Sequence, residues 1–144
     1  MIEIAQLREA DRAAWERLAR GYKAFYETEL ADGQYEESWR RLLAGERVHG
    51  LAAWLDGRIV GIAHYLFHAQ TWSADACYLQ DLFTAPEARG RGVASALIEG
   101  VAAAARLQGA AKYYWMTKED NRTARALYDR VACFKGFVRY DHPM

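Results

Sequence analysis

The chain has 144 residues, of which 52% are hydrophobic and 26% are charged, and its 19 basic and 19 acidic side chains give zero net charge. This length and composition are typical of a folded protein with a hydrophobic core, so we expect residues 1–144 to form a single domain. Balanced charge argues against nucleic-acid partners, which usually require a basic excess. Because no long apolar run and no leader-like start occur, we expect no membrane partner and a cytoplasmic location.

The first half of the chain predicts a strand, two helices and a hairpin. The hydrophobic spacing places these elements, in order, at residues 2–7, 15–26, 34–43, 48–55 and 59–67. Asp11 is a candidate cap of the first helix, because its side chain can accept from free backbone N–H groups. Asp56 and Gly57 both tolerate a positive φ angle, so this pair predicts a tight turn between the last two strands.

The second half of the chain alternates strands with helices. These elements lie, in order, at residues 78–84, 93–104, 112–116, 124–131 and 136–140. Pro86 ends the first strand, Asp120 or Asn121 caps the last helix, and the short aromatic strand at 112–116 is expected to be buried. We expect an α/β fold, with a mixed antiparallel and parallel central sheet of six or seven strands and about four helices. Ligands of such sheets bind at the carboxyl ends of strands, beside helix N-termini.

Cysteine and histidine are few, and their spacing predicts no metal site. Cys77 and Cys133 lie in apolar segments, which favours free, buried thiols over a disulfide or a nucleophile. His64 and His68 are four residues apart, but they lie in a predicted strand, where they share a face without the geometry of a zinc-binding helix.

Two glycines precede the helix predicted at 93–104. A helix N-terminus leaves backbone N–H groups unpaired and carries partial positive charge, and glycine lets an anion approach those groups closely. Gly90 and Gly92 therefore predict a phosphate-binding turn, to which Arg89 and Arg91 add charge. A plain tight turn with solvated arginines is the alternative. The motif lacks the third glycine of a dinucleotide fingerprint and the Gly-Lys-Ser/Thr of a P-loop.

Two motifs and the order of the elements resemble the GNAT superfamily of N-acetyltransferases. The stretch YLQDLFTAPEARGRGVASALI resembles that family's strand, pyrophosphate loop and helix, and its segment Arg89–Ala94 fits the signature Arg/Gln-x-x-Gly-x-Gly/Ala. Downstream, NRTARALYDR followed by GFVRY is similar to the family's Asn-x-x-Ala-x-x-Leu-Tyr and Gly-Phe pattern. Within the superfamily, the chain resembles the diamine (spermidine/spermine) acetyltransferase branch and a small-amine, amino-acid and histone-type branch. The resemblance implies the GNAT fold across nearly the whole chain.

The resemblance implies acetyl-CoA as the cosubstrate and no metal. Backbone N–H groups from Gly90 to Ser95 match those that hold the pyrophosphate, and the strand edge at Leu82 matches the one that pairs with pantetheine. A main-chain N–H near Leu82 would also polarise the thioester carbonyl, as an oxyanion hole does. Asn121 matches a cofactor contact, although a plain helix cap is its alternative role. The implied cofactor-binding residues are Leu82, Phe83, Thr84, Arg89, Gly90, Arg91, Gly92, Val93, Ala94, Ser95, Asn121 and Tyr128.

In the reaction that the resemblance implies, a neutral amine attacks the thioester and coenzyme A leaves as a thiolate. Tyr128 matches the family's acid for that thiolate, since a free tyrosine has a pKa of about 10 and keeps its proton at neutral pH; a core aromatic is its alternative role. The diamine-type enzymes use a glutamate where this chain has Gln80, which cannot act as a base. Asp81 follows Gln80, and we expect its side chain on the face of the strand opposite to that of Gln80. His64, His68 or a water chain are the other candidate bases.

The first two helices and the loop between them are expected to select the acceptor. Aromatic rings with a few carboxylates suit a small cation, although a core stripe is the alternative reading of the aromatics. The candidate acceptor-binding residues are Tyr22, Phe25, Tyr26, Glu27, Gln80 and Asp81, with Trp72 and Asp75 from the connection before the strand at 78–84. We expect acetylation of a primary amine on a small cationic molecule, such as a polyamine or an amino acid. A protein lysine or N-terminus is an alternative acceptor, and a non-catalytic acyl-CoA-binding module is an alternative function.

The end of the chain suggests a second subunit. The sequence stops four residues after Tyr140, whereas many members of the family add a further strand at this point. An open edge strand is a pairing surface, so we expect a homodimer in which a partner subunit completes the sheet.

Overall fold

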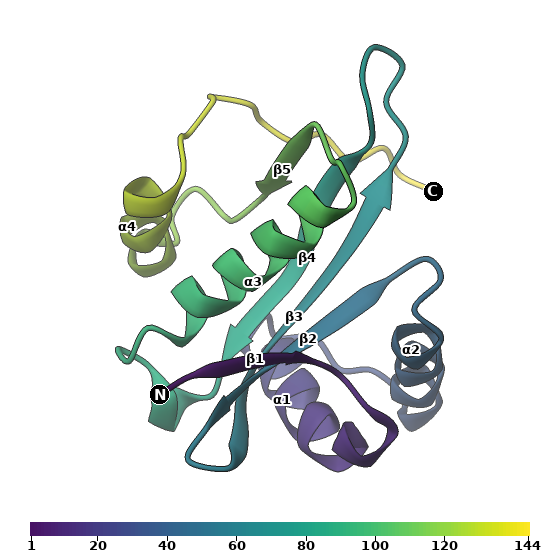
Figure 1. Cartoon of the computed structure of the whole chain (residues 1–144), viewed down its shortest axis with the longest axis vertical. Helices are drawn as coiled ribbons and strands as arrows, with labels where there is room; N and C mark the ends of the chain where they lie inside the picture. Colours follow the sequence, from purple (N-terminus) through teal and green to yellow (C-terminus); the bar gives the residue numbers. More distant parts are fainter.

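Five strands form one mixed sheet in the order β1-β2-β3-β4-β5, so strands that follow one another in sequence also lie side by side (Figure 1). The computed structural model describes residues 1–144. Its elements are, in chain order, β1 (Glu3–Gln6), η1 (Glu9–Asp11), α1 (Arg12–Phe25), α2 (Asp32–Ala44), β2 (His49–Leu55), β3 (Arg58–His68), β4 (Ala76–Thr84), η2 (Pro86–Ala88), α3 (Val93–Leu107), β5 (Lys112–Trp115) and α4 (Arg122–Val131). The first three strand pairs are antiparallel, whereas β4 and β5, joined through α3, are parallel. The expected α/β fold is confirmed, with five strands in place of six or seven.

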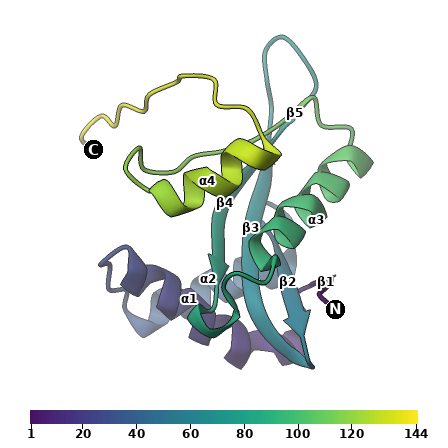
Figure 2. The same cartoon turned by 90° about the vertical axis from the view of Figure 1, so that its left-hand side faces the viewer.

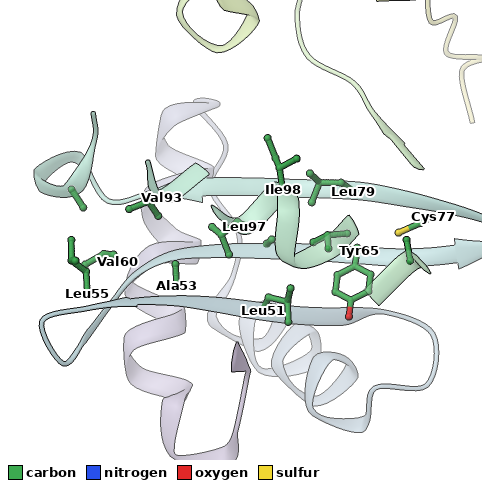
Figure 3. Packing of buried hydrophobic residues seen from close by; sticks show 14 residues of the cluster. Leu51, Ala53, Leu55, Val60, Tyr65, Cys77, Leu79, Val93, Leu97 and Ile98 are labelled. Atoms are coloured by element: carbon green, nitrogen blue, oxygen red, sulfur yellow. The ribbon is translucent and has the colours of Figure 1, made fainter. Parts of the chain in front are cut away.

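Helices cover both faces of the sheet, with α1 and α2 on one face and α3 on the other (Figure 2). Apolar residues of α3 recur at helical spacing, and Leu97 and Val101 are buried against β2 and β3 in the cluster drawn in Figure 3. Trp15 and Leu18 of α1 pack with Trp39 of α2 on the opposite face. We call these two sides of the sheet the α3 face and the α1 face.

An extra residue in β4 reverses the alternation of its side chains. His64 of β3 pairs with Asp81, but the next residue, Tyr65, pairs with Leu79, so Gln80 has no partner on β3. Leu79 lies in the cluster on the α3 face, and an unbroken strand would place Asp81 on that face too. The bulge turns Asp81 to the α1 face, where it contacts His64. The placement of Asp81 expected from regular alternation was wrong for this reason.

The parallel strands β4 and β5 pair over only part of their length. Residues Ala76–Leu79 of β4 pair with β5, which ends at Trp115. The segment Gln80–Thr84 of β4 therefore has β3 on one side and no strand on the other. Backbone groups on this free edge can pair with an extended ligand, as an added strand would.

The C-terminal segment differs from expectation. All of residues 132–144 is exposed, and residues 136–140 form no strand. Alternation along a segment predicts a strand only if a partner edge accepts it.

Two expectations about burial also differ from the structure. The strand β5 is half-exposed and not buried, and Cys133 is exposed whereas Cys77 is buried; both thiols are free. No helix combines the length and the apolar character needed to cross a bilayer.

Candidate active site

The N-terminus of α3 presents unpaired backbone N–H groups. The first hydrogen bond of the helix runs from Ala96 N–H to Gly92 O, 3.0 Å, and no side chain caps the groups before it. Gly90 and Gly92 have φ angles of 75° and 84°, and a methyl group built on either would meet no atom within 4 Å. Glycine is therefore needed at these positions for the positive φ angles of the turn, and not because a larger side chain would clash. Unpaired N–H groups at a helix N-terminus can donate hydrogen bonds to an anion such as a diphosphate.

Arg89 links this turn to the free edge of β4. Arg89 Nε donates to Thr84 O, 3.3 Å, and its guanidinium lies 5.7 Å from the Phe83 ring, which ties the turn to the end of β4. Arg91 is exposed. The Leu82 side chain packs toward the α3 face and that of Phe83 is buried on the α1 face. Only the main chain of these two residues is therefore left for a ligand at the free edge.

Tyr128 of α4 lies beside the end of β5. Its ring packs edge-on against Trp115, with 5.4 Å between ring centroids. Burial raises the pKa of Tyr128, and the neighbouring Tyr26 at the end of α1 adds to this effect, so the phenol keeps its proton at neutral pH. Asn121 Oδ1 accepts from Ala124 N–H, 3.3 Å, and is the cap of α4.

Three side chains from α1, β3 and β4 form a hydrogen-bonded chain on the α1 face. Trp15 Nε1–H donates to His64 Nε2 across 2.9 Å, and His64 Nδ1 lies 2.9 Å from Asp81 Oδ2. The bulge at Gln80 brings the carboxylate within reach of the imidazole. Both ring nitrogens of His64 are engaged in this chain, so neither is left to bind a substrate.

The electrostatic surroundings keep Asp81 ionised. Burial opposes its ionisation, but the hydrogen bonds from His64 and the nearby Tyr22 hydroxyl outweigh this effect and hold the pKa of Asp81 below its ordinary value. Burial and the charge of Asp81 together raise the pKa of Tyr22, which remains a protonated donor. Lys23 adds positive charge nearby. The result is a fixed carboxylate immediately before Leu82, suited to a cationic group.

Aromatic residues of α1 connect this carboxylate with the tyrosine of α4. The Tyr22 and Tyr26 rings lie 5.1 Å apart, and Phe25 packs edge-on against Tyr26 at the same distance while remaining more than half exposed. Tyr22 faces Asp81 and Tyr26 lies near Tyr128. The structure therefore brings together, around the end of α1, residues that are about 100 positions apart in the sequence.

Other residues selected from the sequence lie at the margin or farther away. Glu27, with a φ angle of 53°, and the bulged Gln80 are both exposed. Trp72 and Asp75 belong to the connection between β3 and β4, which extends beyond the sheet (Figure 1). Asp75 is six residues from Asp81, roughly 20 Å along an extended strand, and is not brought to the carboxylate.

The hydrogen-bonding role of Trp15 was not visible in the sequence. Trp15 belongs to an apolar helical stripe, and 49 residues separate it from His64, so no local pattern signals their contact. His68, the other candidate base, bonds to the Tyr114 hydroxyl across 2.9 Å and is half-buried at the end of β3.

Comparison with known proteins identifies the family of this chain. The profile of the acetyltransferase (GNAT) family matches residues 7–132. The chain is 30% identical over 135 residues to the D-amino-acid N-acetyltransferase HPA3 of Saccharomyces cerevisiae, covering 91% of this chain and 84% of that protein. It is 28% identical over 116 residues to the thialysine N-epsilon-acetyltransferase of Mus musculus, covering 81% of this chain and 68% of that protein.

Solved structures share the fold at lower sequence identity. The aminoglycoside acetyltransferase AAC(6')-Iy, in complex with a bisubstrate analogue, aligns with a TM-score of 0.89 at 19% identity over 100% of this chain and 99% of its own. The ribosomal-protein-alanine N-acetyltransferase of Brucella melitensis aligns with a TM-score of 0.84 at 20% identity over the whole of both chains. The family match over residues 7–132 and the similarity to HPA3 show that the chain belongs to the GNAT family and is an acetyl-CoA-dependent N-acetyltransferase that acts on amines.

Proposed function

We propose that this enzyme acetylates the primary amine of a small cationic molecule of the polyamine or amino-acid type. The observation that carries the proposal is the Asp81 carboxylate, which is held ionised on the α1 face immediately before Leu82. A charge-assisted hydrogen bond joins such a carboxylate to an ammonium group. The Tyr22 and Tyr26 rings are surfaces of the kind that attract cations, since Lys23 and Lys118 lie 5.7 Å and 5.8 Å from their centroids. The similarity to enzymes named for D-amino acids and thialysine supports a small acceptor.

Acetyl-CoA supplies the activated acetyl group, and the open turn before α3 fits its diphosphate. In our proposal the N–H groups of Gly90–Ser95 bind the pyrophosphate, with charge added by Arg89 and Arg91. The free edge at Leu82–Thr84 pairs with the pantetheine arm, and the main-chain N–H near Leu82 polarises the thioester carbonyl. Asn121, besides capping α4, contacts the same cosubstrate.

Tyr128 is the proposed acid for the leaving group. The amine nitrogen forms a bond to the acetyl carbon and releases its second proton to water, the carbon–sulfur bond breaks, and the Tyr128 hydroxyl gives its proton to the departing sulfur. Its raised pKa supports this role, because an acid must still be protonated when the thiolate forms. Solvent then returns a proton to the phenolate.

The amine must lose a proton before its nitrogen can attack. Gln80 cannot accept one, and both nitrogens of His64 are already engaged. Full transfer from an ammonium group of pKa about 10 to an aspartate of pKa about 4 costs roughly 8 kcal/mol, which is too unfavourable for a simple base. We therefore propose that Asp81 binds and orients the amine and that water beside the exposed Gln80 carries the proton away.

Release of coenzyme A thiol from acetyl-CoA against a panel of amines tests the proposed acceptor. The panel holds polyamines, L- and D-amino acids, thialysine, an aminoglycoside, a neutral aromatic amine and a basic peptide. We expect the highest kcat/KM with a small cationic amine. Preference for the peptide would overturn the proposed acceptor class, and preference for the neutral amine would overturn the role given to the carboxylate.

We also propose that the enzyme is a homodimer. The strand β5 has a free outer edge, and Phe137, Val138 and Tyr140 are exposed in the segment after α4. Light scattering at micromolar concentration tests this proposal, with an expected mass of about twice 16.4 kDa. A mass equal to that of one chain would overturn it.

A further inference from the structure

We propose, building on the proposed function, that Trp15 and His64 are positioning residues. Trp15 holds His64 in its Nδ1–H tautomer, and His64 in turn fixes the Asp81 carboxylate for the acceptor amine. Neither Trp15 nor His64 touches the acceptor or the acetyl group in this arrangement. Their effect on the reaction passes through Asp81.

The hydrogen-bonding groups allow one position for the imidazole hydrogen. An indole N–H donates and never accepts, so His64 Nε2, which lies 2.9 Å from Trp15 Nε1, is the acceptor. The hydrogen of the neutral ring then lies on Nδ1, 2.9 Å from Asp81 Oδ2, and donates to the carboxylate. If the hydrogen were on Nε2, that N–H would face the Trp15 N–H, and the two donors could not bond. The Nδ1 atom would then have no hydrogen to donate to Asp81. Trp15 therefore selects the tautomer that serves Asp81.

Packing fixes the orientation of the hydrogen-bonded side chains Trp15, His64 and Asp81 before any ligand binds. The Trp15 side chain is only 1% exposed and packs on Trp39, with 5.1 Å between ring centroids. His64 lies inside β3 and is paired with Gly50 of β2 and with Asp81 of β4. An indole buried between a helix and a sheet keeps one orientation, as a group that supports a binding residue must.

The groups that face the carboxylate come from three elements. They are Tyr22 and Lys23 from α1, His64 from β3 and Tyr78 from β4. A carboxylate has about four lone-pair sites, and His64 occupies one of them on Oδ2. The others remain for the Tyr22 hydroxyl and for the N–H bonds of the acceptor. Because His64 limits the rotation of the carboxylate, Asp81 directs the amine toward the thioester in addition to attracting it.

Nuclear magnetic resonance reads the tautomer without any acceptor present. Long-range ¹H–¹⁵N correlations of the imidazole rings should show His64 with its hydrogen on Nδ1. Because His68 Nδ1 lies 3.0 Å from Ala69 O and gives a similar signal, the His68→Gln variant assigns the two rings. We expect a mixture of tautomers at His64 in Trp15→Phe and no change in Trp39→Phe. A wild-type His64 with its hydrogen on Nε2 would overturn the proposal.

Steady-state kinetics separates positioning from packing. We expect Trp15→Phe and His64→Leu to raise the amine KM roughly 3- to 10-fold, the effect of one lost hydrogen bond, with the acetyl-CoA KM unchanged. His64→Asn keeps a donor near the Nδ1 position and should recover part of the loss. Trp39→Phe removes an indole from the same cluster but leaves the bonded chain intact. An equal rise in the amine KM for Trp39→Phe and Trp15→Phe would overturn the positioning role.

The Asp81→Asn variant distinguishes failure of this role from failure of the proposed function. If Asp81→Asn raises the amine KM while folded Trp15→Phe and His64→Leu proteins do not, Asp81 binds the amine unaided and only the positioning role falls. If Asp81→Asn leaves the amine KM unchanged, amine recognition by Asp81 is wrong and the positioning role falls with it. A rise of the amine KM in all three variants, together with a His64 hydrogen on Nδ1, supports both amine recognition by Asp81 and the positioning role of Trp15 and His64.

Discussion

His64 Nδ1 and Asp81 Oδ2 meet across 2.9 Å between β3 and β4, although 17 residues separate them in the sequence. The contact exists because Gln80 is an extra residue in β4, which turns Asp81 to the same face as His64. The carboxylate thereby lies immediately before Leu82, where β4 has a free edge. Amine recognition and thioester binding, as we propose them, then depend on two consecutive residues of one strand.

Replacing Asp81 with asparagine removes the charge and keeps the shape of the side chain. We expect the KM for a cationic amine to rise about 10- to 100-fold, since a hydrogen bond to a charged group contributes about 1.5–3 kcal/mol. The acetyl-CoA KM should not change. Steady-state kinetics measures both constants, and Asp32→Asn, at a carboxylate 91% exposed at the start of α2, is the control. An unchanged amine KM would show that the acceptor binds elsewhere.

The same carboxylate should contribute to stability in a pH-dependent way. Burial opposes its ionisation, but His64 and Tyr22 hold the pKa of Asp81 below its ordinary value. A lowered pKa in the folded state stabilises the protein above the unfolded value of about 3.9, and this contribution is lost as the pH falls through the folded-state pKa. Urea unfolding of the wild type and Asp81→Asn should show a stability difference at pH 7 that decreases as the pH falls below about 4. The same difference at both pH values would contradict this linkage.

Tyr128→Phe removes the proposed acid and keeps the ring that packs on Trp115. We expect kcat to fall about 10- to 1000-fold, because proton transfer by a positioned acid contributes effects of this order. Calorimetric binding of acetyl-CoA should be unaffected. Tyr113→Phe is a matched control, since it removes a buried hydroxyl that donates to Ile98 O, 3.0 Å, and should lower stability by about 1 kcal/mol without changing kcat. Wild-type turnover in Tyr128→Phe would refute the role of acid.

Glycines at the two ends of α3 allow backbone strain to be separated from ligand binding. Gly92 and Gly109 have φ angles of 84° and 76°, and neither has an atom within 4 Å of a built Cβ. Alanine at either position should destabilise the protein by about 1 kcal/mol, because L-residues disfavour this conformation. Only Gly92→Ala should also weaken acetyl-CoA binding, measured by calorimetry. If both variants bind acetyl-CoA equally well, the turn before α3 does not hold the diphosphate.

The two thiols should differ in reactivity. Burial raises the pKa of Cys77 to about 11, whereas Cys133 is exposed. A thiolate is the reactive form, so an aromatic disulfide reagent should modify one thiol per folded chain and a second one only after denaturation. The Cys133→Ser variant should not react while folded. Rapid modification of folded Cys133→Ser would show that the β4 strand opens at Cys77.

Much of the fold could be predicted from local patterns. The turn at Asp56-Gly57 has positive φ angles of 51° and 75°, as the residue types predict, and Asn121 caps α4. The helix after Gly92 follows from apolar spacing over more than three turns. Such features depend on residues within a few positions of one another, so the chain specifies them wherever it folds. The roles of Gly90–Ser95 and Tyr128 stay predictions, which came from a motif and not from geometry.

The features that could not be predicted depend on contacts between segments that are far apart in the sequence. Residues 136–140 alternate like a strand but form none, because no strand edge pairs with them. The face of Asp81 depends on how β4 pairs with β3, and a single bulge reverses it. The link from Trp15 through His64 to Asp81 joins a helix to two strands over 66 positions, a contact that no local spacing encodes. The sequence by itself therefore determined the elements and the family motifs, whereas the tertiary structure decided which side chains share one face, since strand register is a long-range property.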